Sequence, residues 1–272
     1  MDIVSNIVAK VNSILWDYIL IIILCGSGIY FTIRLKFVQI LKFKDGWDRT
    51  FGSLSLKGKA ADKEGMSSFQ SLATAIAAQV GTGNLAGAAT ALISGGPGAI
   101  FWMWVSAFFG MATIFVEASL GQKYKTTTED GHTIGGPAYY ITAAYKGALG
   151  KLLAVLFAIF IILALGFMGN MVQSNSISGA FVNAFPTLKP IYVGIICAII
   201  AAFIFIGGLR RIASFTEKVV PVMALFYIIG SIIIIIMNIK NLPSAIVLIF
   251  TSAFNPQAVI GGGLGIGIQQ AM

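Results

Sequence analysis

The chain has 272 residues, of which 57% are hydrophobic and 10% charged, with a formal net charge of +8. A soluble domain usually has about a quarter charged residues, so this composition excludes an ordinary soluble protein and predicts a membrane protein. The apolar runs exceed about 18 residues and no series of short alternating strands occurs, which favours spanning helices over a barrel.

Residue types that support catalysis or metal binding are scarce. His132 is the only histidine, and the two cysteines, Cys25 and Cys197, lie within apolar runs, where they are best interpreted as small core residues. The sequence has no phosphate-binding glycine–lysine loop and no paired carboxylates. We therefore expect neither an enzyme nor an ATP-driven pump, and no cofactor.

Hydrophobic runs and their polar boundaries predict spanning segments in chain order. An amino-terminal span is followed by a polar, basic segment over 34–66. This segment is interpreted either as containing an interfacial helix or as a solvated loop. The later spans are separated by turns rich in glycine or proline. The predicted spans are 14–33, 67–93, 99–122, 152–184, 191–209 and 219–237.

The last part of the chain is predicted to begin a further unit. Residues 243–255 are interpreted as an outer hairpin or short helix, and four glycines fall within 261–265. Such a cluster of glycines inside an apolar run predicts a second broken helix.

The placement of the basic residues predicts the orientation in the membrane. Fifteen of the 18 lysines and arginines fall on one side of the predicted spans, and only Lys10, Lys189 and Lys240 fall on the other. Basic residues gather on the cytoplasmic side, so we expect the amino terminus outside and 34–66 in the cytoplasm of a cell-membrane protein. This distribution accounts for the positive charge without a nucleic-acid partner.

The most informative stretch is 77–87, in the middle of the second predicted span. Its two closely spaced glycines, Gly81 and Gly83, weaken helical hydrogen bonding. Gln79 and Asn84 would be costly if they faced lipid. A helix broken at this depth is tolerated only where its backbone groups are buried or line a cavity, as in secondary transporters. The alternative is an unbroken helix that packs closely through its glycines, with Asn84 bonded to a neighbour.

The functional interpretation of this break assigns its backbone groups to two ligands. The amides of Thr82 and Gly83 would bind a carboxylate, because free N–H groups at a helix start attract anions. The carbonyls of Ala77, Gln79 and Val80, with the side-chain oxygen of Asn84, would hold a hard cation such as sodium.

Three other polar side chains are candidates for supporting roles. Asn170 and Gln173 share a face of the fourth span, whereas Asn175 turns away. Gln173 could line the pocket or form a bond between helices. Glu117, interpreted as the only acidic residue deep in a span, could bind a proton or sodium; we favour a role in bracing a broken helix.

Several stretches in combination resemble the alanine/glycine:cation symporter family, the sodium:alanine symporters. They are the segments 79–87, 95–104, 135–140 and 169–173, with Asn255-Pro256-Gln257-Ala258. More distantly, 78–84 and 117–121 are similar to the first two core helices of leucine-transporter-type symporters. The resemblance covers most of the chain.

The resemblance implies an all-α polytopic fold of two inverted five-helix repeats. The amino-terminal helix and cytoplasmic segment would occupy 1–66, the first repeat 67–240, and the start of the second repeat 241–272, with core helix six beginning near Gln257. The family is longer than this chain, so we expect a fragment that lacks most of the second repeat.

By the same resemblance, the substrate site comprises Gln79, Gly81, Thr82, Gly83, Asn84, Gln173 and Gly263, with sodium at Ala77, Gln79, Val80 and Asn84 and support from Glu117 and Asn170. The expected function is sodium-coupled uptake of small neutral amino acids, alanine and glycine, by alternating access. A proton-coupled permease is the nearest alternative. A channel or a structural membrane subunit would be the alternative from another class.

Overall fold

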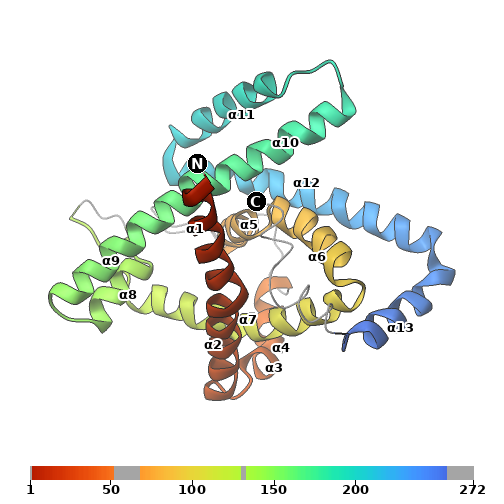
Figure 1. The fold of residues 1–272 in the computed structure, drawn as a ribbon. Helices are drawn as coiled ribbons and strands as arrows, with labels where there is room; N and C mark the ends of the chain where they lie inside the picture. Colours follow the sequence, from red (N-terminus) through yellow and green to blue (C-terminus); the bar gives the residue numbers. More distant parts are fainter. Residues whose placement is uncertain (1, 52–67, 130–132, 256–272) are drawn as a thin grey trace.

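The computed structural model describes residues 2–51, 68–129 and 133–255, which are mostly helical (Figure 1). The amino-terminal part contains α1 (Asp2–Ser13), the π-helical segment η1 (Ile14–Ile19), α2 (Leu20–Arg34), α3 (Val38–Leu41) and α4 (Phe43–Phe51). It is followed by α5 (Ser68–Gln79), π-helical η2 (Gly83–Gly87), α6 (Ala88–Gly95) and α7 (Gly98–Lys123).

The rest of the described chain begins with a short hairpin of β1 (Thr126–Thr127) and β2 (Thr133–Ile134), paired antiparallel. The helices after it are α8 (Pro137–Ala144), α9 (Ala148–Ile161), π-helical η3 (Ile162–Gly169), α10 (Asn170–Ala184), α11 (Pro190–Phe205), α12 (Gly208–Met237), the short 3₁₀-helix η4 (Ile239–Asn241) and α13 (Leu242–Ser252).

The helices confirm an all-α, multi-pass membrane protein. Among the described residues, three helices are long and apolar enough to cross a bilayer: Gly98–Lys123, Ala148–Ala184 and Arg211–Met237. The bent pair Phe69–Gln79 and Gly83–Gly95 makes a fourth if it is one span. The first and fifth predicted spans correspond to shorter apolar helices, Leu20–Arg34 and Pro190–Phe205, which fall below the roughly 20 residues that a full crossing needs.

Two boundaries differ from the sequence-based expectation for physical reasons. The sixth predicted span starts at residue 219, but α12 starts at Gly208, because charged residues at a membrane surface extend a helix into water without cost to its hydrogen bonds. Residues 34–51 contain α3 and α4, and the chain turns into α3 through Lys36 and Phe37, both in the left-handed region. Residues 52–67 lie outside the described part.

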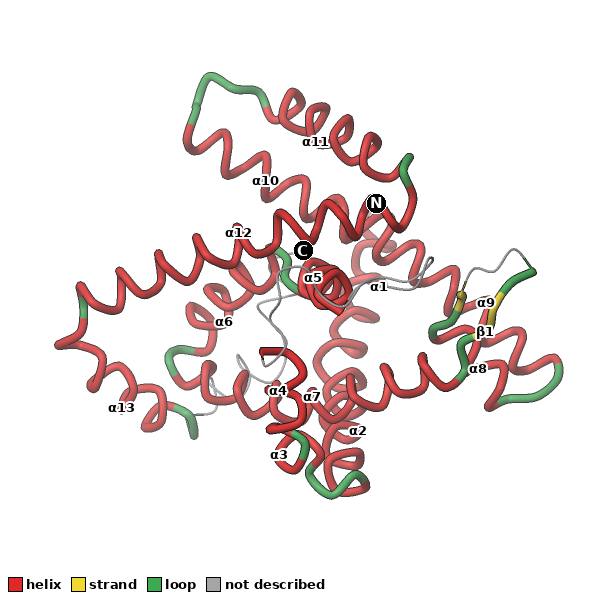
Figure 2. The backbone as a smooth tube through the Cα atoms, turned by 180° about the vertical axis from the view of Figure 1, so that it is seen from behind, coloured by secondary structure: helices red, strands yellow, loops and turns green. Residues whose placement is uncertain are grey.

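Packing partners are set by small residues at the contacts. Gly28 of α2 lies directly on Phe109 of α7, where an added Cβ would be 3.0 Å from the Phe109 Cβ. Figures 1 and 2 show α10 and α11 side by side as a hairpin that projects from the other helices. The first half of the broken helix, α5, packs on α12, whereas the second half, α6, packs on α7.

Large apolar side chains cover the surface, and small ones fill the contacts. The buried hydrophobic residues are alanines and valines, whereas Ile93 and Phe226 are 85% and 76% exposed. In water such exposure would be costly, but hydrocarbon is as apolar as these side chains, so close packing by small residues joins the helices instead.

The turn between α6 and α7 is also the docking site of α13. Gly96 has φ +70°, which glycine adopts without strain. A Cβ on Gly98 would collide with the carbonyl of Ser252, and the Trp102 indole N–H donates to the Ala253 carbonyl. Phe101 stacks edge-on against Phe250 at 5.7 Å between ring centroids. The predicted outer hairpin or short helix is thus a helix, packed on the start of α7.

Candidate functional site

The second predicted span is broken where its glycines predict. Helix α5 ends at Gln79, with a last backbone bond from Val80 N–H to the Ile76 carbonyl of 2.8 Å, and η2 begins at Gly83. The two halves meet at 54°. The alternative of an unbroken helix that packs through its glycines is therefore wrong.

Two side-chain oxygens take the N–H groups that the break releases. Gly81 N–H donates to Asn84 Oδ1 at 3.0 Å, and Thr82 N–H donates to Gln173 Oε1 at 3.2 Å. In a continuous α-helix these two N–H groups would bond the carbonyls four residues earlier. The break therefore uses one acceptor from its own helix and one from α10, 91 residues away.

The same change in hydrogen bonding removes the usual N–H donors of two backbone carbonyls. Ala77 and Ala78 would receive the N–H groups of Gly81 and Thr82 in a regular helix, and these now bond to side chains. Carbonyl oxygens at a helix end carry partial negative charge and attract a cation. Ala77 belongs to the predicted sodium ligands; Ala78 was not predicted, although helical hydrogen-bond spacing from Thr82 identifies it.

Gln173 packs directly over the glycine of the break. An added Cβ on Gly81 would be 2.5 Å from Gln173 Nε2, closer than real Cβ contacts. A side chain at residue 81 would therefore displace Gln173 from the Thr82 amide. The structure brings Gly81, Thr82, Asn84 and Gln173 together at the break.

The other predicted residues fall in different places. Asn170 donates to the Gly166 carbonyl of its own helix at 2.9 Å. Glu117 is exposed on α7 and lies near Tyr140 of α8, whose pKa is raised by burial and, to a lesser degree, by the Glu117 charge. Gln79, Val80 and Gly83 are exposed around the break. Gly263 and the predicted second break lie outside the described residues.

A second polar contact, which the sequence did not predict, links the broken span to α12. Gln70 Nε2 donates to Glu217 Oε2 at 2.9 Å, and one turn further the hydroxyls of Thr74 and Thr216 lie 3.1 Å apart. Glu217 is half-buried and lies inside α12, so it is a second acidic residue within a helix that can span the membrane. The i, i+4 spacing of Gln70 and Thr74 was the available signal.

Comparison with known proteins identifies the group to which this chain belongs. A family model described as "Sodium:alanine symporter family" matches residues 1–272. The chain belongs to the sodium:alanine symporter family. The resemblance inferred from the segments around 79–87 and 169–173 is confirmed, and the family is one of transporters, not enzymes.

Three relatives within the sodium:alanine symporter family match this chain over 52% to 58% of their own length. The "Putative sodium/proton-dependent alanine carrier protein YrbD" of Bacillus subtilis is 45% identical over 264 residues, covering 97% of this chain and 52% of the relative. The "Sodium/alanine symporter AgcS" of Methanococcus maripaludis is 44% identical over 269 residues, or 98% and 58% of the two chains. The "Probable sodium/glutamine symporter GlnT" of Bacillus subtilis is 41% identical over 272 residues, 100% of this chain and 55% of the relative. The chain thus spans about half the length of the curated relatives it matches.

Proposed function

We propose that the protein couples the uptake of a small neutral amino acid, such as alanine or glycine, to sodium across the cell membrane. The observation that supports this most directly is the break at Gly81, where two N–H groups and two carbonyls leave helical bonding at one point. Such a point offers opposite partial charges within a few ångströms, which suits a zwitterion beside a cation. Membership of the family supports the same assignment.

In this proposal, Gln173 marks the position of the substrate carboxylate. Its amide oxygen accepts a hydrogen bond from Thr82 N–H at 3.2 Å. A substrate carboxylate oxygen could take its place as the acceptor, and the bond would be stronger because that oxygen is charged. The Gly83 amide would supply a second donor. Gln173 would then move aside and use its amide nitrogen as a donor to the bound carboxylate.

Sodium would bind on the opposite side of the break. The proposed ligands are the carbonyls of Ala77, Gln79 and Val80 and the Asn84 side-chain oxygen; we add the Ala78 carbonyl, because Thr82 N–H bonds to Gln173 instead. Asn84 Oδ1 has two lone pairs, one of which accepts from Gly81 N–H. A sodium ion bound to the other lone pair of Asn84 Oδ1 would connect the sodium site directly to the backbone amides that bind the substrate. Binding of either ligand would then strengthen binding of the other to the same extent.

We further propose that 67–240 is the first of two inverted five-helix repeats that work by alternating access, preceded by 1–66 and followed by the second repeat from 241 onward. Gly263 would line the second break of that fold, and Glu117 and Asn170 would support the helices around the site. The amino terminus would be outside, with 34–66 in the cytoplasm, as the 15-to-three distribution of basic residues indicates.

The deciding experiment is uptake of radiolabelled alanine into proteoliposomes that contain the protein expressed from its complete reading frame. We expect uptake with an inward sodium gradient and little when choline or potassium replaces sodium. Unchanged uptake in choline would contradict sodium coupling.

Proton coupling is the alternative to test in the same vesicles, because the name of the Bacillus subtilis relative YrbD includes both ions. Uptake driven by a pH gradient without sodium would establish it. Single-channel currents in a planar bilayer would indicate a channel. For a purely structural subunit, Asn84→Ala would alter stability without a selective loss of alanine binding.

A further inference from the structure

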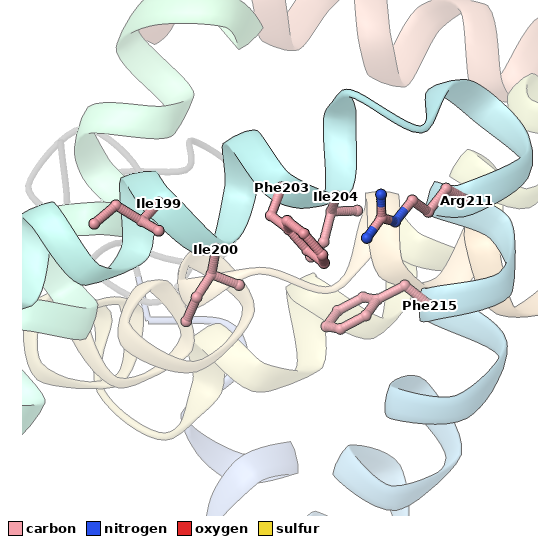
Figure 3. Close-up of a pocket in the computed structure, with 6 residues that line it drawn as sticks. All are labelled: Ile199, Ile200, Phe203, Ile204, Arg211 and Phe215. Carbon is pink, nitrogen blue, oxygen red and sulfur yellow. The ribbon is translucent and has the colours of Figure 1, made fainter.

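A pocket of about 330 Å³ lies between α11 and α12 (Figure 3). It is lined by five apolar side chains and one arginine: Ile199, Ile200, Phe203, Ile204, Phe215 and Arg211. Figure 3 shows the Arg211 guanidinium beside Phe203 and Ile204, near the connection between the two helices, with Ile199 further along α11. The pocket therefore has one charged end and an apolar remainder.

The position of Arg211 is determined by its neighbours. Its guanidinium carbon lies 4.0 Å from the centroid of the Phe203 ring, a cation–π contact. Gly207 makes this arrangement possible, because a Cβ there would collide with the Arg211 side chain. The arginine stem therefore folds back over the end of α11 and directs its charged group over the pocket.

Within the described residues, no carboxylate forms an ion pair with Arg211. The ion pair found among the described residues joins Lys42, which directly precedes α4, to Asp45 within α4. Glu217, the acidic residue nearest in sequence on α12, bonds to Gln70 instead. Among the residues that line the pocket, Arg211 is the one with a charge. The pocket thus presents a half-buried guanidinium whose five N–H donors suit an anion with several oxygens.

The location of the pocket limits what can fill it. Both helices are strongly apolar, and their connection brings Arg211 to the end of the candidate span Arg211–Met237, where we expect a membrane surface. At about 30 Å³ for a group the size of water or methylene, the volume accommodates on the order of ten groups, a segment of one acyl chain.

We propose that this pocket binds one anionic phospholipid, with part of an acyl chain against the isoleucines and phenylalanines and the phosphate against Arg211. Charge complementarity supports an anionic headgroup, since basic pockets between membrane helices bind such headgroups. A free phosphate ion would find one charged ligand and five apolar side chains, a poor set for a small hydrated anion.

The test measures lipid binding to the purified protein from its complete reading frame by native mass spectrometry. Palmitoyl-oleoyl phosphatidylglycerol is titrated against the zwitterionic phosphatidylcholine with the same chains. We expect phosphatidylglycerol to bind one saturable site at least about tenfold more tightly, and Arg211→Gln to lose about that factor, as expected for a charge-assisted contact.

Lys218→Gln is the matched control, because it removes one positive charge from the same helix at an exposed residue that does not line the pocket. We expect its affinity for phosphatidylglycerol to stay within about twofold of the unmodified protein. An equal loss in both variants would indicate a general effect of charge and overturn the proposal. Equal affinity for the two lipids would overturn it as well.

A second variant keeps the proposal testable if Arg211→Gln does not fold. Ile200→Trp fills the apolar part and leaves Arg211 in place, so we expect it to weaken phosphatidylglycerol binding several-fold. Unchanged binding in Ile200→Trp would exclude an acyl chain in the pocket. The last measurement adds millimolar inorganic phosphate to the protein with bound phosphatidylglycerol. Displacement of the lipid by phosphate would assign the site to a free anion instead.

Discussion

The span from α9 to α10 and the span at Gly81 both leave α-helical geometry within apolar sequence, and they do so in different ways. The span from α9 to α10 contains the π-helical segment η3, yet the residues at both of its ends, Ile161 and Asn170, keep right-handed helical dihedrals. Its 37 residues remain one continuous span. The span at Gly81 turns by 54° and is divided between α5 and α6.

The difference lies in where the backbone N–H groups go. In η3 the bonding register changes while the helix continues, and Asn170 adds one side-chain bond to the Gly166 carbonyl. At the break, side chains from residue 84 and from α10 accept the N–H groups, so carbonyls lose the donors of a regular helix. The break thus exchanges helical hydrogen bonds for side-chain ones, as the proposed site requires, whereas η3 stays within a continuous helix.

The strongest test of this contrast is Gly81→Ala. The new Cβ would displace Gln173 from the Thr82 amide, so we expect sodium-dependent alanine uptake to fall by more than about tenfold. Gly179→Ala on α10 is the control, since a Cβ there meets nothing within 4 Å. Uptake by Gly81→Ala equal to that of Gly179→Ala would remove Gln173 from the proposed site.

Asn84→Ala should have the next largest effect. It removes the acceptor of Gly81 N–H and a proposed sodium ligand, and we expect the sodium concentration for half-maximal uptake to rise about tenfold. Asn84→Asp keeps an oxygen at this position and should retain part of the affinity. An unchanged sodium requirement in Asn84→Ala, with lower stability only, would support a purely structural role.

A smaller effect is expected from the contact that holds α5 against α12. Gln70→Ala and Glu217→Ala should each lower the thermal unfolding midpoint in detergent, and the double variant should lower it by less than the sum. We expect a coupling free energy of about 1 kcal/mol for this half-buried bond. Gln70→Ala combined with Lys240→Ala is the control pair and should be additive.

The smallest effect should come from η3. Asn170→Ala removes one exposed side-chain bond within a continuous helix, so we expect alanine uptake to stay within about twofold of the unmodified protein. A loss as large as that of Asn84→Ala would show that η3 also takes part in binding, and the distinction drawn between the two spans would then be wrong.

The sequence predicted features that depend on local chemistry. Gly81 and Gly83 within an apolar run predicted the break, and Gly95-Gly96-Pro97-Gly98 predicted the turn, which has Gly96 at φ +70°. Helical spacing also separated Gln173 from Asn175 correctly: Gln173 contacts the break and Asn175 is exposed.

The features that were not predicted depend on contacts between distant segments. Gln70 and Glu217 are 147 residues apart, and helical spacing shows which face a residue occupies but not which helix it meets. Glu217 was assigned to the connection before the sixth span because Arg210, Arg211 and Lys218 make that stretch polar. The π-helical segments have no composition that distinguishes them from α-helix.

The two halves of the broken span rest on different supports. Helix α5 is joined to α12 through Gln70 and Thr74, whereas α6 leads through the Gly96 turn into α7, where α13 is locked by Trp102. The peptide units from Val80 to Thr82 connect these two assemblies at the break, and η4 connects them a second time, between α12 and α13. A tilt of one assembly against the other would therefore have to be absorbed at these two short connections, one of which carries the Asn84 and Gln173 contacts.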